Sequence, residues 1–221
     1  MGTRAFKDQL YPRFANVAAA LGSPKRFEIL DLLAQSERSV EDLARETDLT
    51  IANASQHLRK LHAARLVETR REGTFVHYRL ASRGIARLLR TVEEITEDRD
   101  AGLARIVRRH LGERPAPEIT AEELSGRIGD PSLILLDVRP LREYRAGHIA
   151  GAQALPLNEL AKLRQLPFPK RAEIVAYCRG PYCTFADEAV AILRRQGYRA
   201  RRLSVGASEW ELLGLGISRS A

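Results

Sequence analysis

The chain has 221 residues, more than the roughly 100 to 150 residues of a typical single domain, so its length predicts two modest domains. Hydrophobic residues make up 44% and charged residues 29% of the chain, with a formal net charge of +8, which excludes a disordered or collagen-like protein. Its apolar stretches are far shorter than the about 20 residues that cross a bilayer, and its first ten residues lack the apolar core of a secretory signal. We therefore expect a cytoplasmic protein without a membrane partner.

The first predicted elements are two helices within residues 15–33. They are separated where Ser23 precedes Pro24, which is the pattern of an N-cap followed by proline at the first helical position. Ser39, with Asp42 three residues later, resembles a capping box and predicts the start of a short third helix.

Thr50 is expected to cap a fourth helix after a turn at residues 47–49. The apolar residues of this helix follow a 3,4,3 spacing that predicts a core-facing stripe: Ile51, Ala54, Leu58 and Leu61. Residues 66–70 and 74–80 then alternate with strand period around residues 71–73, which predicts a β-hairpin. A further helical stretch, residues 85–111, is a candidate dimerisation helix.

Positive charge is concentrated in residues 57–90, which hold nine basic residues and two acidic ones. A concentrated basic stripe favours binding to phosphates through counterion release, whereas an evenly basic surface is merely solvated. The clustering therefore favours nucleic acid as a partner.

Residues 113–117, which contain two prolines and have little apolar content, are interpreted as a linker between a first domain of residues 1–112 and a second of residues 118–221. In the second domain, residues 133–138 and 173–177 are apolar strands, and residues 187–195 have a helical pattern. Strands that alternate with helices predict an α/β domain with a parallel sheet.

The stretch ANASQHLRKL at residues 52–61, followed by LVETRREGTFVHYRL at residues 66–80, resembles the ArsR-type winged-helix repressors. The resemblance covers roughly the first hundred residues and implies an α+β winged helix-turn-helix, mostly helical with a β-hairpin wing. It also implies a homodimer on a palindromic double-stranded operator, because a two-fold dimer presents two recognition helices.

The polar face of the fourth helix is expected to read base edges in the major groove, and the wing to contact phosphates. The alternative is a winged-helix interaction module whose charged face is only solvated. The candidate base-reading residues are Asn53, Ser55, Gln56 and Arg59, and the candidate phosphate-contacting residues are Lys60, Arg70, Arg71 and Thr74.

Many relatives of these repressors bind metals, but the present chain predicts no metal site. Its third helix has no cysteine, and a single histidine, His110, accompanies Asp98 and Asp100 on the last helix of the first domain. Zinc normally takes several His or Cys ligands, so a solvated helix face is the preferred interpretation of these residues.

The second domain resembles rhodanese sulfurtransferases over nearly its whole length. The matching pieces are LDVR at 136–139, EY at 143–144, GHIAGA at 147–152, LPL at 155–157, IVAYC at 174–178, Gly206 and EW at 209–210. By this resemblance, the Cys178 thiolate attacks a sulfane sulfur donor, holds the sulfur as a persulfide and passes it to a thiol acceptor, with no cofactor.

Cys178 begins a loop between an apolar strand and a helix, where backbone N–H groups and the helix N-terminus are expected to lower its pKa. Arg179 is a second candidate catalytic residue, which attracts an anionic donor. The rest of the predicted active-site loop is Gly180, Pro181, Tyr182 and Thr184, and the predicted bracing residues are Asp137, Arg139, Glu143 and His148.

Cys183 occupies a loop position where a basic residue often assists binding of thiosulfate, which puts thiosulfate in doubt as the natural donor. Two interpretations of Cys183 stay open: a resolving cysteine that attacks the Cys178 persulfide, or a small buried side chain. A phosphatase of the same domain shape requires arginine six residues after the cysteine, where this chain has Thr184, so phosphatase chemistry is disfavoured.

The preferred hypothesis is a homodimeric transcriptional regulator in which a persulfide on Cys178 senses or handles reactive sulfur and changes DNA binding. An alternative hypothesis is a sulfurtransferase enzyme that carries a DNA-binding domain without coupling between the two. A third, an inert rhodanese-like dimerisation module, is disfavoured by the intact cysteine loop. Only the first requires a coupling free energy between the two sites.

Overall fold

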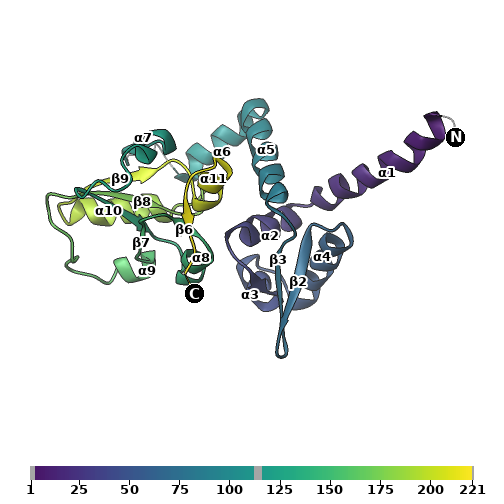
Figure 1. Cartoon of the computed structure of the whole chain (residues 1–221), viewed down its shortest axis with the longest axis horizontal. Coiled ribbons are helices and arrows are strands. Elements are labelled where there is room, and N and C mark those ends of the chain that lie inside the picture. The colour runs from purple at the N-terminus through teal and green to yellow at the C-terminus, as the bar shows by residue number, and fades with distance from the viewer. Residues whose placement is uncertain (1–2, 112–115, 221) are drawn as a thin grey trace. The chain divides into compact units, whose positions relative to one another are not determined.

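The structure, a computed structural model, describes residues 3–111 and 116–220 and divides into two compact units between Val92 and Glu93. Figure 1 labels the elements of both units. The predicted domain boundaries at residues 112 and 118 stay a prediction, and most of the predicted linker lies outside the described residues.

The first unit is mostly helical, with a β-hairpin near its end. Strands β2 and β3 form the antiparallel hairpin, and β1 pairs with the other edge of β3. The elements are α1 (Thr3–Leu21), α2 (Pro24–Gln35), β1 (Arg38–Ser39), α3 (Val40–Glu46), α4 (Ile51–Ala63), β2 (Val67–Glu72), β3 (Phe75–Leu80) and the start of α5 (Arg83–Arg99). This order confirms the predicted winged helix-turn-helix.

Two of the three predicted helix caps in this unit, Ser39 and Thr50, make the expected side-chain hydrogen bond. The Ser39 side chain accepts a hydrogen bond from the Asp42 backbone N–H, and Thr50 does the same for Asn53. Pro24 occupies the first turn of α2, although the Ser23 side chain makes no cap bond. The caps fix where α3 and α4 begin, and therefore which face of α4 is exposed.

Two details of the predicted helices are wrong. Ile51 is 52% exposed, because it lies in the first turn of α4, before the core that begins at the fully buried Ala54. The predicted helix over residues 85–111 is two helices, α5 and α6 (Ala101–Leu111). They are interrupted at Asp100, whose carboxylate accepts a hydrogen bond from the Gly102 backbone N–H at 2.7 Å and so competes with helical pairing.

The second unit contains a five-stranded sheet of order β4-β9-β8-β5-β7, with all neighbours parallel. Its elements after α6 are β4 (Glu118–Ile119), α7 (Ala121–Ser125), β5 (Leu133–Asp137), α8 (Leu141–Ala146), β6 (His148–Ile149), β7 (Gln153–Ala154), α9 (Leu157–Leu160), β8 (Glu173–Tyr177), α10 (Phe185–Arg195), β9 (Arg199–Leu203), α11 (Ala207–Leu212) and β10 (Ile217–Ser218). The predicted α/β domain with a parallel sheet is confirmed.

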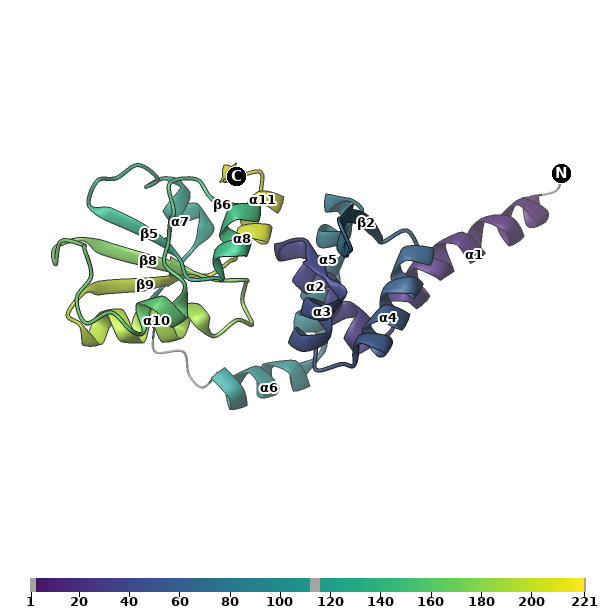
Figure 2. The same cartoon turned by 90° about the horizontal axis from the view of Figure 1, so that it is seen from below.

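Helices cover both faces of this sheet, as Figure 2 shows for α10 on one side and α7 and α11 on the other. Along β8, Ile174 and Ala176 face the α10 side, while Val175 and Tyr177 face the side of α7 and α11. Because β8 is buried on both faces, the residue that follows it, Cys178, leaves the sheet in a fixed position.

Candidate functional site

Cys178 lies at the carboxyl end of β8, at the start of a loop that leads into α10. Its side chain is buried, with 3% of its surface exposed. Its thiol donates a hydrogen bond to the Cys183 carbonyl oxygen, with the sulfur 3.5 Å from that oxygen. Gly180 has φ +145°, a conformation that glycine adopts easily, and Tyr182 is exposed. The loop therefore places two free cysteines side by side.

The ionisation of this pair differs from the sequence prediction, which expected a lowered pKa for Cys178. The hydrogen bond with Cys183 and burial raise the pKa of Cys178 well above its ordinary value, whereas backbone hydrogen bonds at Ala186 and Gly180 act in the opposite direction. The hydrogen bond from Cys178 lowers the pKa of Cys183 to about 7, and Arg179 contributes in the same direction. Of the two thiols, the more exposed Cys183 is therefore the one that ionises first as pH rises.

Alkylation of the reduced protein by iodoacetamide should show this division of charge. Because the thiolate is the reactive form, we expect the Cys183 rate to rise with pH, to reach half its maximum near pH 7 and to level above that pH. In the Cys178→Ala variant, Cys183 loses the hydrogen bond that lowers its pKa, so the levelling should move to higher pH. Peptide-resolved mass spectrometry measures both rates.

The matched variant is Cys183→Ser, in which Cys178 loses the main interaction that raises its pKa. Its alkylation should therefore shift to lower pH than in the wild type. A wild-type Cys183 rate that keeps rising to about pH 9, like an unperturbed thiol, would contradict the assigned ionisation.

Arg179 is engaged by a buried carboxylate of α8. Its Nη2 lies 2.6 Å from Glu143 Oε1, its Nε lies 3.1 Å from both carboxylate oxygens, and Glu143 is fully buried. A bidentate pair of this kind holds a guanidinium in one orientation. Glu143 thus braces the loop through Arg179, and much of the charge of Arg179 is compensated before any anionic donor arrives.

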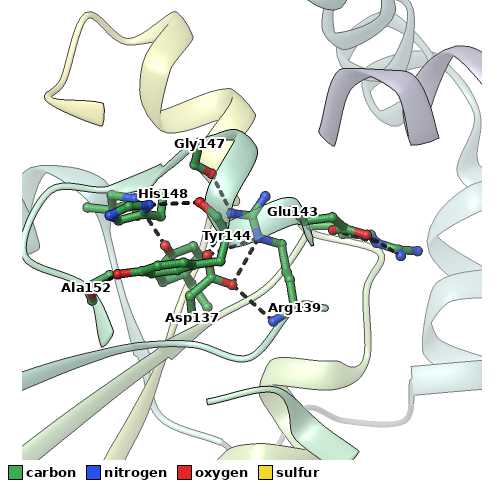
Figure 3. Close-up of polar contacts among 10 residues, drawn as sticks. Asp137, Arg139, Glu143, Tyr144, Gly147, His148 and Ala152 are labelled. Carbon is green, nitrogen blue, oxygen red and sulfur yellow. Dashed lines mark hydrogen bonds and ion pairs between the residues drawn. The ribbon is translucent and has the colours of Figure 1, made fainter. Parts of the chain in front are cut away.

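Asp137 and Arg139 form a buried ion pair at the end of β5, next to β8. Arg139 Nη2 lies 2.6 Å from Asp137 Oδ2 and 2.7 Å from the Gly147 carbonyl oxygen, and Figure 3 shows this arrangement. Burial opposes the charge of Arg139, but the bonds to Asp137 outweigh it and raise the pKa of Arg139. The pair ties β5 to the residues after α8, which supports the bracing role predicted for both residues.

His148 belongs to the same braced region. Its ring stacks on Tyr144 with centroids 3.7 Å apart, and its Nδ1 lies 2.8 Å from the Tyr144 carbonyl oxygen. The Tyr144 hydroxyl in turn donates to the carbonyl oxygen of Ala152 at 2.9 Å. These contacts tie His148 and Tyr144 to each other and to Ala152, which indicates a structural role.

Two residues outside the predicted site, Gly206 and Glu209, also shape the cysteine loop. A Cβ at Gly206 would lie 2.5 Å from the Arg179 carbonyl group, so only glycine lets the two segments approach this closely. Glu209 accepts a hydrogen bond from the Gly206 backbone N–H at 2.9 Å and lies beside Gly180. Both belong to the matching pieces of the sequence, but their distance along the chain from Cys178 hid their role.

The exposed face of α4 forms the second candidate site. Ala54, Leu58 and Leu61 are fully buried, which turns the opposite face of the helix to solvent. The exposed predicted DNA-binding residues are Asn53, Gln56, Arg59 and Lys60 on α4 and Arg71 and Thr74 on the wing, whereas Ser55 is half-buried. The four exposed predicted residues of α4 are therefore available to a partner, whereas Ser55 lies partly against the packed side of the helix.

Arg70 has carboxylate partners within the wing region. Its Nη2 lies 2.7 Å from Glu37 Oε1 and 2.9 Å from Glu72 Oε2. The hydrogen bonds that Arg70 donates to Glu37 and Glu72 raise the pKa of Arg70. A phosphate would have to compete with these carboxylates, which makes Arg70 the weakest of the predicted phosphate contacts.

Metal ligands do not gather at either site. Within residues 3–111 and 116–220, no group of three or more His, Cys, Asp or Glu side chains has a metal-binding arrangement. None of the helices in this described part of the chain has the length and apolar character needed to cross a membrane.

Comparisons with known proteins identify both halves of the chain. The model of the bacterial regulatory protein family arsR matches residues 23–69, and that of the rhodanese-like domain matches residues 120–213. The chain is 43% identical to the HTH-type transcriptional regulator Rv0324 of Mycobacterium tuberculosis, across 97% of this chain and 94% of that protein.

Two further matches each cover one half. The putative sulfur carrier protein YrkF of Bacillus subtilis is 32% identical across 38% of this chain and 44% of that protein. Among solved structures, a homodimeric winged helix-turn-helix DNA-binding domain from Mycobacterium bovis is 39% identical and covers 46% of this chain and 93% of its own length, with a TM-score of 0.43.

Proposed function

We propose that this chain, which belongs to the ArsR family of bacterial transcriptional regulators and carries a rhodanese-like domain, is a sulfur-responsive regulator. Its winged-helix unit binds a palindromic operator as a homodimer. Cys178 takes up a sulfane sulfur as a persulfide, and this modification changes the affinity for the operator.

The observation that carries the proposal is the loop of Cys178 in a chain that is a transcriptional regulator. The loop retains its nucleophile and a second thiol whose pKa is about 7. It is also braced by Glu143 through Arg179 and by the close approach of Gly206. An inert module would not need two hydrogen-bonded thiols in a braced loop.

The chemistry begins when a low-molecular-weight persulfide donates its outer sulfur to the loop. The Cys178 thiolate attacks that sulfur, the S–S bond of the donor breaks, and the donor leaves as a thiolate. The proton that Cys178 must lose passes to Cys183, its hydrogen-bond partner. Cys178 then holds a persulfide, with no net oxidation beyond that supplied by the donor.

Cys183 is the resolving residue in this proposal. Cys183, whose pKa is about 7, first gives the proton that it took up to the departing donor thiolate. Its own thiolate then attacks the inner sulfur of the Cys178 persulfide, a disulfide closes between the two cysteines, and the outer sulfur leaves as HS⁻. The hydrogen bond between the two thiols in the reduced loop, which places the two sulfurs next to each other, supports this step. The persulfide and the disulfide are two modified states to which DNA binding can respond.

Dimerisation is supported by exposed apolar side chains on α1. Phe6, Tyr11 and Phe14 are each about three-fifths exposed, which is unusual for large apolar residues on one helix. Ile95 on α5 is exposed to a similar extent. A second copy of the chain would bury these residues and present two α4 helices to the two half-sites of an operator.

The DNA-binding half of the proposal is tested with a duplex selected from a random-sequence pool by the full-length protein. Arg59→Ala removes an exposed guanidinium from the presented face of α4, so we expect affinity to fall by about 1–3 kcal/mol, or about five- to 150-fold. Fluorescence anisotropy measures the dissociation constants for selected and scrambled duplexes.

The control is Arg219→Ala, which removes the same charge from an exposed position of the second unit. It should leave the affinity for the selected duplex nearly unchanged. Equal affinity of Arg59→Ala and wild type for the selected duplex would overturn the assignment of α4 as the recognition helix.

A sulfurtransferase without coupling to DNA binding is the second candidate function. The same two-cysteine loop favours it, because a Cys178 persulfide that passes its sulfur to an external thiol completes a catalytic cycle. The two candidates differ only in whether the modification of Cys178 changes operator affinity.

A further inference from the structure

We infer that the rhodanese-like unit carries a second DNA-contacting surface, a basic pole that binds the phosphate backbone of duplex DNA beside the operator. The basic pole consists of seven exposed side chains: Lys162, Arg164, Lys170, Arg171, Arg194, Arg195 and Arg199. This inference rests on the proposed DNA binding by the winged-helix unit and adds a surface in the other half of the chain.

Contacts between distant segments assemble the basic pole. The loop after α9 packs on the end of α10, where Gln196 Nε2 donates to the Leu163 carbonyl oxygen at 2.7 Å. Lys170 lies 3.8 Å above the ring of Tyr198 and donates to the Gln196 carbonyl oxygen. This loop and α10 can be followed in Figures 1 and 2. The loop, the last turn of α10 and the start of β9 thus present their basic residues together.

The charge of the basic pole is not neutralised within the protein. In the described residues, 3–111 and 116–220, no ion pair joins any of the seven side chains to a carboxylate. The nearby Glu173 is engaged by Arg127 at 3.0 Å and lies 3.6 Å from Arg201. Other arginines of this unit, such as Arg139 and Arg179, are paired with buried carboxylates. Their positive charge is therefore compensated, whereas that of the basic pole is not.

The basic pole lies at the opposite end of the sheet from the cysteine loop. Arg171 precedes β8 and Arg199 begins β9, whereas Cys178 follows the other end of β8. The five residues of β8 span about 16 Å at about 3.3 Å per residue. The pole is therefore separate from the sulfur site, and both can be occupied at once.

Duplex DNA fits this surface better than an acidic protein does. Five of the seven residues are arginines, whose planar guanidinium groups bind phosphate with two parallel hydrogen bonds. A protein interface usually has an apolar centre, but the large exposed apolar residue within the pole, Leu163, is only 38% exposed. The covalent link to a DNA-binding unit also raises the local concentration of duplex around the pole.

The test compares a short selected duplex with the same sequence extended by about 20 base pairs on each side, using the full-length protein. The pole variant is Arg164→Gln with Arg195→Gln, and the matched control is Arg145→Gln with Arg219→Gln. All four are exposed arginines of the same unit, so both variants lose two charges. Anisotropy titrations over a range of salt concentrations give the affinity and its salt dependence.

We expect the wild type and the control to bind the extended duplex more tightly than the short one, and the pole variant to lose this gain. The loss should be about tenfold near 0.1 M salt, and the slope of log affinity against log salt should shrink by up to about 2 per chain. Equal gains for pole variant and wild type overturn the inference and leave an acidic protein as the remaining partner.

A loss that is equal for both duplexes, or equal in the control variant, would also overturn it, because it would reflect overall charge. The proposed function fails in a different way. If the wild type does not discriminate the selected duplex from a scrambled one, operator binding itself is wrong, whatever the pole variant does.

Discussion

Replacing Cys178 with serine is expected to abolish persulfide formation on this protein completely. A serine hydroxyl remains protonated near neutral pH, so it cannot replace the thiolate as the attacking group on a sulfane sulfur. Serine is similar to cysteine in size, so it should fit the buried position of Cys178 without disturbing the braced loop. Mass spectrometry after treatment with inorganic polysulfide should show the added sulfur on Cys178 of the wild type only.

The companion variant Cys183→Ser separates uptake from resolution. Cys178 should still take up sulfur, but its persulfide should last longer and HS⁻ release should stop, because the attacking thiolate of Cys183 is missing. An unchanged persulfide lifetime in this variant contradicts the resolving role. Persulfide on Cys183 alone, with Cys178 replaced, contradicts the assignment of the sulfur acceptor.

Replacing Arg139 with methionine is expected to destabilise the rhodanese-like unit by about 3–5 kcal/mol. The substitution leaves Asp137, which is fully buried, without its ionic partner, and an uncompensated buried charge is strongly unfavourable. Denaturant titration measures the free energy of unfolding. The fluorescence of Trp210, the chain's single tryptophan and a buried residue of this unit, reports the transition.

The control for this prediction is Arg219→Met, which breaks an exposed ion pair with Glu211. Exposed pairs contribute about 0–1 kcal/mol, so the control should unfold near the wild-type midpoint. A loss below about 1 kcal/mol for Arg139→Met would show that the Asp137–Arg139 pair does not hold the unit together.

The sequence predicted the elements in which a local pattern determines the structure. The 3,4,3 spacing placed Ala54, Leu58 and Leu61 in the core, and Thr50 capped α4 as expected. The mostly apolar residues 173–177 predicted a strand of a parallel sheet, and β8 is that strand, buried on both faces.

The two wrong predictions concern the burial of a residue and the length of a helix, and both depend on contacts outside the local apolar pattern. Ile51 fits the apolar stripe of α4, but the core ends before the first turn of the helix. Asp100 interrupts a long amphipathic pattern because its side chain offers the backbone another hydrogen-bond acceptor. Neither effect can be seen in the spacing of apolar residues.

The chemistry of the cysteine loop was only partly predictable. Strand and loop order placed Cys178 at the end of a strand, as the structure has it, but the sequence could not show that Cys183 would hydrogen-bond to it. The bracing contacts join residues far apart in the chain, such as Arg179 with Glu143. For that reason the sequence predicted the location of the site better than the charge state of its two thiols.

The most direct test of the account is operator affinity before and after treatment with inorganic polysulfide, in the wild type and in Cys178→Ser. The account predicts that treatment changes the wild-type dissociation constant by about five- to 150-fold, the effect of a coupling free energy of about 1–3 kcal/mol, and leaves the variant unchanged. An unchanged wild-type affinity, with persulfide present on Cys178, would contradict coupling and leave an uncoupled sulfurtransferase.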